Sequence, residues 1–256
     1  MKVVVLVKQT FATEARIELD ESGEIVSSRV KKVVNPYDEF AVEEAIQLVE
    51  RKQAEKAAVL SVGNTETQEG LRQCLAMGVD EAVLIDESGM GGADSSITAE
   101  LLAAALKKIG FDLILSGYVA VDDNAAQVPM RVAEILGIPH VNVVSRLEVQ
   151  ENSVKAWREA DGRTEVLATQ LPCLVTADKS LNKPRYPTLP NIMKAKKKPL
   201  ATYTPADLGV DLKSPGCRVV RHFLPAGRAG AHLFDGTPSE AAAALVSALR
   251  NEAKVV

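Results

Sequence analysis

The stretch that decides the fold is VVVLV at residues 3–7, a continuous run of β-branched and apolar side chains. A strand that is apolar on both faces is typical of a parallel sheet covered by helices on both sides. Similar short apolar runs recur at 57–62, 82–85, 112–116 and 140–144. Helical periodicity lies between them, at 35–53, at 65–77, at 97–109 and in a stretch ending near Leu136. This alternation predicts a doubly wound α/β fold.

Residues 146–177 have a different pattern, in which short alternating segments are separated by turn residues. Asp161-Gly162 is a hairpin signal, so we expect these segments to extend the parallel sheet with antiparallel strands. Residues 8–34 likewise predict a hairpin excursion with a turn at 20–23. The predicted architecture is a mainly parallel, Rossmann-like sheet, in which ligands bind beyond the carboxyl ends of the strands.

The helix expected at 35–53 has clear start signals. Asn35 is a good N-cap residue, Pro36 suits the first helical position, and Asp38 favours the positive end of the helix dipole. We expect an apolar stripe to face the core, with the glutamates of this helix in water: Glu43, Glu44 and Glu50. The start of the helix could bind an anion through its free N–H groups, but simple capping explains the same residues equally well.

The turn after the strand at 112–116 is the strongest candidate for a nucleotide site. Gly117 allows close approach of the backbone, and N–H groups around 124–128 open the next helix. Asp122 and Asp123 would place negative charge near a phosphate. We therefore expect at least one of them to turn towards ribose hydroxyls, backbone caps or solvent. The alternative is a turn rich in capping groups.

Composition excludes several classes of protein. The 256 residues are 46% hydrophobic and 25% charged, which fits one large globular domain, and a net charge of −4 argues against a nucleic-acid binder. No apolar run approaches the length of a membrane span, and Met1 leads into the first strand without a signal-peptide layout, so we expect a cytoplasmic protein. The three cysteines are scattered, so we expect neither a disulfide nor a metal site. Motifs of nucleophilic, metal-dependent or phosphoryl-transfer catalysis are missing, which favours a carrier.

The segment SLNKPRYPTLPNIMKAKKKP at 180–199 has neither helical nor strand periodicity, and four prolines stiffen it. Leu189 lies beside Pro190 in this run, and four lysines follow. An exposed leucine beside basic residues suits brief docking to acidic proteins, because charge speeds encounter while a small apolar contact limits lifetime. The alternative is a solvated surface loop.

The C-terminal part of the chain is expected to form a separate arm. Residues 226–236 are rich in glycine, and Thr237, Pro238 and Glu240 predict the start of an alanine-rich helix that ends near Ala253. We therefore divide the chain into a nucleotide-binding domain at 1–224 and an arm with a helix at 225–256. Because the apolar face of this helix is small, we expect it to pack on a partner subunit or back on the domain.

Several long motifs identify a family. They are LNKPRYPTLPNIMKAKKKP at 181–199, NPYDEFAVEEA at 35–45, LAMGVD at 75–80 and the closing EAKVV at 252–256. In all of them the sequence resembles the beta subunit of electron transfer flavoprotein, of the bacterial type, and the resemblance continues over most of the chain. It implies a non-catalytic electron carrier that forms a heterodimer with an alpha subunit.

The resemblance also implies cofactors and their sites. The alpha subunit would hold most of an FAD, with Tyr37 near the flavin, and this chain would bind AMP. The residues implied around the nucleotide are Leu6, Asn35, Pro36, Tyr37, Asp38, Val59, Val62, Gly117, Ala120, Val121, Asp122, Asp123, Asn124, Ala125, Ala126, Gln127 and Val128. In electron-bifurcating relatives a second FAD occupies the AMP pocket, and this alternative stays open.

The implied partners are redox proteins. Acyl-CoA dehydrogenases of fatty acid beta-oxidation and similar flavoenzymes would deliver electrons, and a quinone oxidoreductase would accept them. The residues implied in docking are Arg185, Tyr186, Leu189, Lys194, Lys196, Lys197 and Lys198. Two other hypotheses for the fold are an ATP-using or AMP-forming enzyme and a nucleotide-sensing regulator. An enzyme of that kind should carry a phosphate-binding lysine or arginine within 117–127, and that turn has neither.

Overall fold

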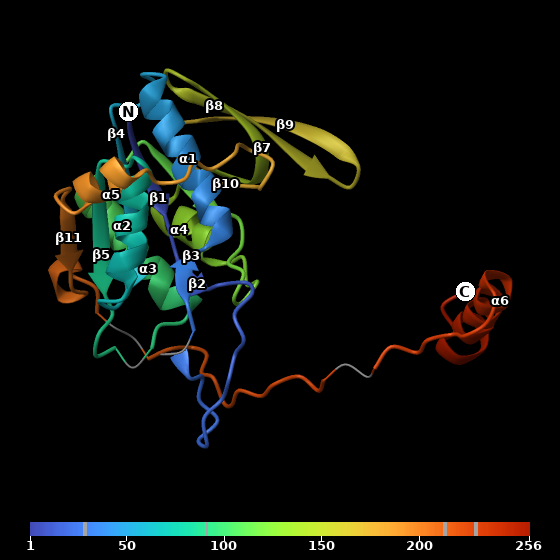
Figure 1. Cartoon of the computed structure of the whole chain (residues 1–256). Coiled ribbons are helices and arrows are strands. Elements are labelled where there is room, and N and C mark those ends of the chain that lie inside the picture. Colours follow the sequence, from blue (N-terminus) through green and yellow to red (C-terminus); the bar gives the residue numbers. More distant parts are fainter. Residues whose placement is uncertain (28–29, 91, 212–213, 228–229) are drawn as a thin grey trace. The chain divides into compact units, whose positions relative to one another are not determined.

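The computed structural model describes residues 1–27, 30–90, 92–211, 214–227 and 230–256 (Figure 1). The chain divides into two compact units, Met1–His222 and Phe223–Val256.

A nine-stranded sheet forms the centre of the first unit, with the strand order β11-β5-β4-β1-β6-β10-β7-β8-β9. Its strands are β1 (Lys2–Leu6), β4 (Lys56–Gly63), β5 (Glu81–Asp86), β6 (Leu113–Gly117), β7 (His140–Gln150), β8 (Ser153–Ala160), β9 (Arg163–Gln170), β10 (Cys173–Ala177) and β11 (Leu200–Tyr203). The strands from β11 to β7 are parallel to their neighbours, whereas β7, β8 and β9 pair antiparallel.

Helices cover both faces of this sheet. The helices are α1 (Pro36–Glu50), α2 (Thr67–Met77), α3 (Ser95–Ile109), α4 (Val128–Leu136) and the short α5 (Leu189–Ala195), with a 3-10 turn at Ala206–Leu208. Val3 and Val5 of β1 pack in one core cluster with α1 and α2, and Val4 and Leu6 pack in a second cluster with α3 and α4. The alternating sides of one strand therefore belong to two cores, and the predicted doubly wound α/β fold is confirmed.

One prediction about the sheet is wrong. The final segment of the 146–177 pattern was expected to be an antiparallel extension, but β10 is parallel and lies between β6 and β7. All five residues of β10 are buried, because a central strand is covered by helices on both faces. The remaining segments form the antiparallel β7–β8–β9 ribbon, as predicted.

The excursion at 8–34 forms less strand structure than expected. Antiparallel pairing joins β2 (Gln9–Phe11) with β3 (Lys32–Val34), at the two ends of the excursion. The turn at 20–23 is flanked by a single bridge between Leu19 and Ile25. Residues 28 and 29 lie outside the described part of the chain.

The prediction that all the glutamates of α1 face water is also wrong. Glu43 and Glu44 are each only 3% exposed. The segment at 182–185 covers them, and it contributes Asn182 and Arg185 as their hydrogen-bond partners. Helical periodicity placed both residues on the polar side, but it could not predict that a distant segment would cover that side.

The second unit contains α6 (Pro238–Ala248), which continues into a π-helical turn at Leu249–Ala253. Thr237 and Glu240 form the predicted capping box: the backbone N–H of Thr237 donates to Glu240 Oε2 at 2.8 Å, and that of Glu240 donates to Thr237 Oγ1 at 3.4 Å. No residue of α6 is buried. Positions 228 and 229 of the expected arm lie outside the described residues.

Candidate functional site

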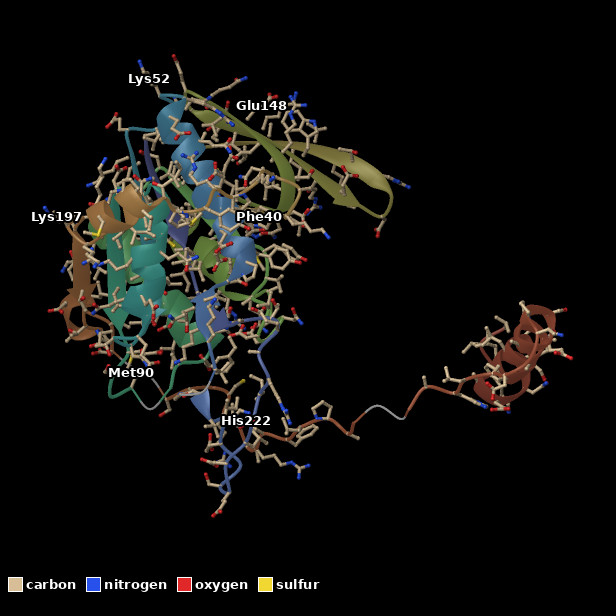
Figure 2. All side chains as sticks on the ribbon, viewed as in Figure 1. Phe40, Lys52, Met90, Glu148, Lys197 and His222 are labelled. Atoms are coloured by element: carbon tan, nitrogen blue, oxygen red, sulfur yellow. The ribbon has the colours of Figure 1, made fainter. Side chains whose placement is uncertain are left out.

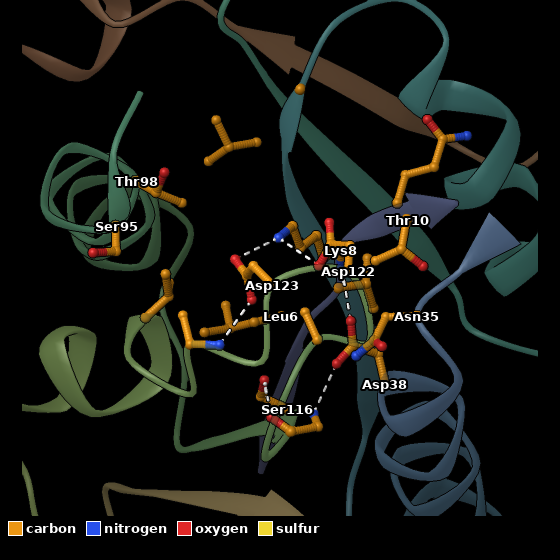
Figure 3. Close-up of a pocket in the computed structure, with 18 of the residues that line it drawn as sticks. Leu6, Lys8, Thr10, Asn35, Asp38, Ser95, Thr98, Ser116, Asp122 and Asp123 are labelled. Atoms are coloured by element: carbon orange, nitrogen blue, oxygen red, sulfur yellow. Dashed lines mark hydrogen bonds and ion pairs between the residues drawn. The ribbon is translucent and has the colours of Figure 1, made fainter. Parts of the chain in front are cut away.

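A cavity of about 450 Å³ lies where β1, β4 and β6 end at their carboxyl edge (Figure 3). Its walls include residues 6–11 from the end of β1 onward, 62–64 at the end of β4 and 116–120 from the end of β6 onward. Ser95 and Thr98 of α3 add polar groups. This is the edge of a doubly wound sheet at which ligands bind, and the volume is in the range of small-molecule sites.

Asn35 and Asp38 join the start of α1 to the loops around the cavity. The Asn35 amide donates to Val119 O at 2.9 Å and accepts from Val121 N at 3.2 Å. The two oxygens of Asp38 accept from Lys8 N at 2.7 Å and from Gly117 N at 2.9 Å. Asn35 occupies the N-cap position as predicted, but its side chain makes no capping bond to the helix. Its side chain organises the cavity wall.

Burial changes the acidity of Asp38. The side chain is almost completely enclosed, and this burial raises its pKa to about 7. The hydrogen bonds from Lys8, Asn35 and Gly117, together with the charge of Lys8, oppose the rise. A carboxyl group with such a pKa changes charge within the physiological range.

Gly117 is required by its contact with α1. A Cβ atom on Gly117 would lie 2.5 Å from Asp38 Oδ1 and 2.7 Å from Tyr37 C and Tyr37 Cβ. Two of these three atoms belong to side chains held by the fold, and one is backbone, so none can easily move away. Glycine therefore allows the end of β6 to touch the first turn of α1.

Lys8 is a cavity residue that the sequence reasoning missed. Its ammonium group donates to Asp122 Oδ1 at 2.9 Å and to Asp123 Oδ2 at 3.0 Å. Burial alone would lower the pKa of Lys8, but the two aspartates raise it above its ordinary value. The only signal in the sequence was the position of Lys8 just beyond the apolar run at 3–7. Asp123 also caps the backbone N–H of Ala125 at 2.9 Å, as expected for at least one of the two aspartates.

The hydroxyl group of Thr10 indicates that the cavity suits a polar ligand. It lines the cavity, is 3% exposed, and its Oγ1 atom has no hydrogen-bond partner among the described residues. A buried hydroxyl without a partner is unfavourable unless a ligand or water satisfies it. Together with the Lys8 ammonium, the cavity therefore offers donors suited to the phosphate or ribose oxygens of a nucleotide.

Most of the site residues implied by the resemblance line this cavity. They are Leu6, Asn35, Asp38, Val62, Gly117 and Ala120, with residues 122–123 and 125–128. The others, Pro36, Tyr37, Val59, Val121 and Asn124, do not line it. Val59 packs in the core cluster under α1 and α2, and Tyr37 forms an edge-to-face pair with Tyr118, with ring centroids 4.7 Å apart.

The sequence of 180–199 suggested a segment without regular structure, but the segment contains a short helix. Leu189 to Ala195 form α5, with Pro190 in its first turn and Thr188 as its N-cap residue. Seven residues are too few to show a clear helical period. Tyr186 is 91% exposed and Leu189 is 79% exposed, so two of the predicted docking residues present their side chains to solvent.

The four lysines that follow Leu189 have different surroundings. Lys194, Lys196 and Lys197 are exposed, and Figure 2 shows Lys197 pointing away from the sheet and helices. Lys198 is half-buried, and its ammonium group donates to three carbonyl oxygens at the end of α2: Leu75 O at 3.1 Å, Gly78 O at 3.2 Å and Val79 O at 2.5 Å. Lys198 therefore caps a helix, whereas the other three can act on a partner through their charge.

The residues that the structure describes include no cluster of three or more histidine, cysteine or acidic side chains that could hold a metal. Of the helices described, none is long and apolar enough to cross a membrane. Cys74 and Cys173 are buried and Cys217 is exposed, and all three are free thiols.

These features define a Rossmann-like α/β protein with a cavity, lined by apolar and polar side chains, at the carboxyl edge of its parallel strands. The family model described as the electron transfer flavoprotein domain matches residues 22–208. The chain belongs to the electron transfer flavoprotein family and, within it, groups with the beta subunits.

Three relatives illustrate this. An electron transfer flavoprotein subunit beta from Bacillus subtilis (strain 168) is 44% identical over 259 residues, which cover 100% of both chains. A subunit beta from Homo sapiens is 40% identical over 220 residues, covering 84% of this chain and 85% of the human one. The caffeyl-CoA reductase-Etf complex subunit CarD from Acetobacterium woodii is 34% identical, with 98% of this chain and 99% of CarD covered. Electron transfer flavoprotein beta subunits are electron carriers, so the hypothesis of an ATP-using enzyme is abandoned.

Proposed function

We propose that this chain binds AMP in the cavity beyond β1, β4 and β6. The observation that carries the proposal is the buried, unpartnered Thr10 hydroxyl in a cavity that also contains the Lys8 ammonium. Residues implied by the family resemblance lie in the same walls. Lys8 is already bonded to two aspartates and can offset little further negative charge, so we propose a nucleotide with a single phosphate rather than one with a longer phosphate chain.

The chain would act in a heterodimer with an alpha subunit that holds most of an FAD. The flavin would carry the electrons, and the residues of this chain would position the nucleotide and present a surface to other proteins. Tyr37, paired with Tyr118 beside the cavity wall, would lie near the flavin. The exposed helix α6 would pack on the alpha subunit, and we place the complex in the cytoplasm.

The experiment is the identification of the bound nucleotides. The chain is co-expressed with its alpha subunit, and the nucleotides released from the purified complex by acid are separated and identified by mass. One FAD and one AMP per heterodimer is the expected result. Two FAD molecules and no AMP would instead assign a second flavin to the cavity, as in electron-bifurcating relatives, and no adenine nucleotide beyond one FAD would contradict the proposal.

We further propose that Leu189 docks into flavin dehydrogenases, including acyl-CoA dehydrogenases of fatty acid beta-oxidation, and that the reduced flavin passes its electrons to a quinone oxidoreductase. The exposure of Leu189 and Tyr186 supports this, since an apolar side chain in water gains free energy when a partner buries it. Lys194, Lys196 and Lys197 would steer an acidic partner. Leu189→Ala should slow reduction of the flavin by the dehydrogenase without loss of bound FAD, and unchanged reduction would remove the docking role.

A further inference from the structure

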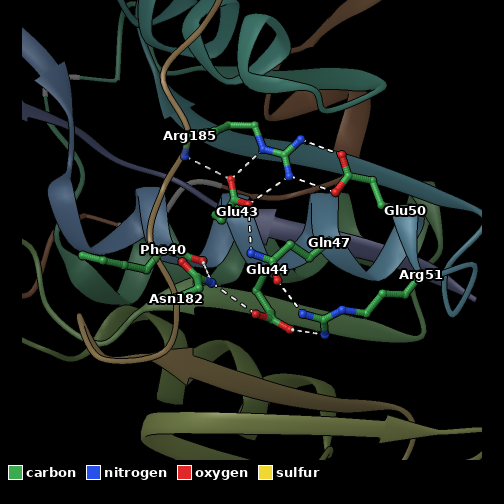
Figure 4. Close-up of polar contacts among 8 residues, drawn as sticks. All are labelled: Phe40, Glu43, Glu44, Gln47, Glu50, Arg51, Asn182 and Arg185. Carbon is green, nitrogen blue, oxygen red and sulfur yellow. Dashed lines mark hydrogen bonds and ion pairs between the residues drawn. The ribbon is translucent and has the colours of Figure 1, made fainter.

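Arg185 precedes residues 186–194, and its side chain forms ion pairs with two glutamates of α1 (Figure 4). Its guanidinium group donates to both oxygens of Glu43 at 2.9 Å, through Nε and Nη2. It also donates to both oxygens of Glu50, at 2.6 Å through Nη1 and at 2.9 Å through Nη2. The backbone N–H of Arg185 adds a bond to Glu43 Oε2 at 3.1 Å. One arginine therefore binds two carboxylates on α1.

The buried carboxylate shows that this contact is built into the fold. The side chain of Glu43 is 4% exposed, and an ionised carboxylate in such a place is strongly unfavourable without a partner. Burial by itself would raise the pKa of Glu43, but the hydrogen bonds from Arg185 and Gln47 hold it below its ordinary value. Bidentate binding by an arginine is also the strongest form of this contact. Glu43 thus depends on Arg185.

Further contacts hold the segment on both sides. Before it, Asn182 Nδ2 donates to Phe40 O at 3.0 Å and to Glu44 Oε2 at 3.1 Å, both on α1. After it, Arg72 of α2 donates to Ala195 O and Lys198 O, each at 2.7 Å. Residues 186–194 therefore lie between an attachment to α1 and an attachment to α2.

The side chains between these attachments are the exposed ones. Tyr186, Leu189 and Met193 are 91%, 79% and 65% exposed. Arg185 is in a different position, because all the side-chain hydrogen bonds described for it go to α1. A guanidinium group occupied by two carboxylates has few donors left for a partner protein.

We infer that Arg185 is a positioning residue: it fixes the start of the segment 186–194 on α1, so that Leu189 is held in place for docking. Arg185 does not itself contact the partner. The inference rests on the proposed docking role of this segment. Ordering the segment in advance lowers the entropy lost on association. Since α1 also carries Asn35 and Asp38, the same helix supports the nucleotide cavity and the docking segment.

The test compares variants of the flavin-containing heterodimer. Arg185→Gln combined with Glu43→Gln removes the contact without leaving an unpaired buried charge, and Glu50→Gln weakens only the exposed half of it. Glu134→Gln, at an exposed glutamate of α4, is the matched control, and Leu189→Ala is the contact variant. Two quantities are measured for each: hydrogen exchange of peptides covering 186–194 against peptides of α3, and the second-order rate of flavin reduction by an acyl-CoA dehydrogenase.

Loss of the contact should raise hydrogen exchange in 186–194 by about tenfold in the double variant and by less in Glu50→Gln, while exchange in α3 stays unchanged. Flavin reduction should be slower in both, and slowest in the double variant. Leu189→Ala should slow reduction while exchange stays as in the wild type. If the double variant reduces more slowly but exchanges like the wild type, Arg185 is a partner contact and the inference is overturned. If its exchange and its reduction rate both equal those of the wild type, the inference is overturned as well. If Leu189→Ala reduces normally, the proposed docking function fails, and the exchange result alone decides whether Arg185 anchors the segment.

Discussion

Replacing Gly117 by alanine should damage the fold and the cavity together. The added Cβ would lie 2.5 Å from Asp38 Oδ1 and 2.7 Å from two atoms of Tyr37, which is closer than real Cβ contacts allow. Either the end of β6 or the first turn of α1 must move. Overpacking of this kind typically costs about 1–3 kcal/mol. A movement would also weaken the bond from Gly117 N to the Asp38 side chain, and a hydrogen bond contributes about 0.5–1.5 kcal/mol, or about 1.5–3 kcal/mol when the acceptor is charged.

The two effects are not additive, because one displacement both relieves the clash and lengthens the bond. We therefore expect Gly117→Ala to lower the free energy of unfolding by about 3 kcal/mol, a large part of the stability of a typical domain. Guanidinium unfolding of the full chain followed by circular dichroism measures this, with the nucleotide concentration held constant because a ligand shifts the midpoint.

Gly216→Ala is the matched control. Its Cβ would have ordinary contact distance, 3.4 Å, to Asp94 Oδ2, and Gly216 is exposed. We expect a change within about 0.5 kcal/mol for this variant. If Gly117→Ala were equally mild, the close contact between β6 and α1 would not be a requirement of the fold, and the reasoning would be refuted.

Two further predictions concern Asp38 and the lysines. The folded-state pKa of Asp38, about 7, is above its ordinary value of 3.8, so its contribution to stability is full below pH 3.8 and is lost as pH rises through 7. The unfolding free energy of the wild type minus that of Asp38→Asn should therefore fall between pH 5 and pH 8, by at most about 1.4 kcal/mol per pH unit, whereas a flat difference would exclude this titration. Lys198→Met should lower stability by about 1–3 kcal/mol, because carbonyl oxygens at and just beyond the end of α2 lose this donor. Lys197→Met should leave stability unchanged and instead reduce the salt dependence of flavin reduction by a dehydrogenase, and the reverse pattern would contradict these assignments.

The sequence by itself determined the features that depend on neighbouring residues. Apolar runs such as Val3 to Val7 predicted the parallel strands, and the start of α1 at Pro36 followed from its local signals. The capping box of Thr237 and Glu240 was predicted for the same reason, since its two partners are three residues apart. The walls of the cavity at Asn35 and Gly117 could be proposed because the carboxyl ends of parallel strands meet at one edge.

The tertiary structure alone decided the features that join distant residues. The pairing of Lys8 with Asp122 spans 114 positions, and that of Arg185 with Glu43 spans 142. Likewise, β10 takes its place between β6 and β7 through pairing with strands that its own pattern does not specify. Local periodicity says which side of an element is apolar, but it does not say which other segment will cover the polar side. That choice depends on the arrangement of the whole chain, which is why the burial of Glu43 and Glu44, and their partners Arg185 and Asn182, became visible only in three dimensions.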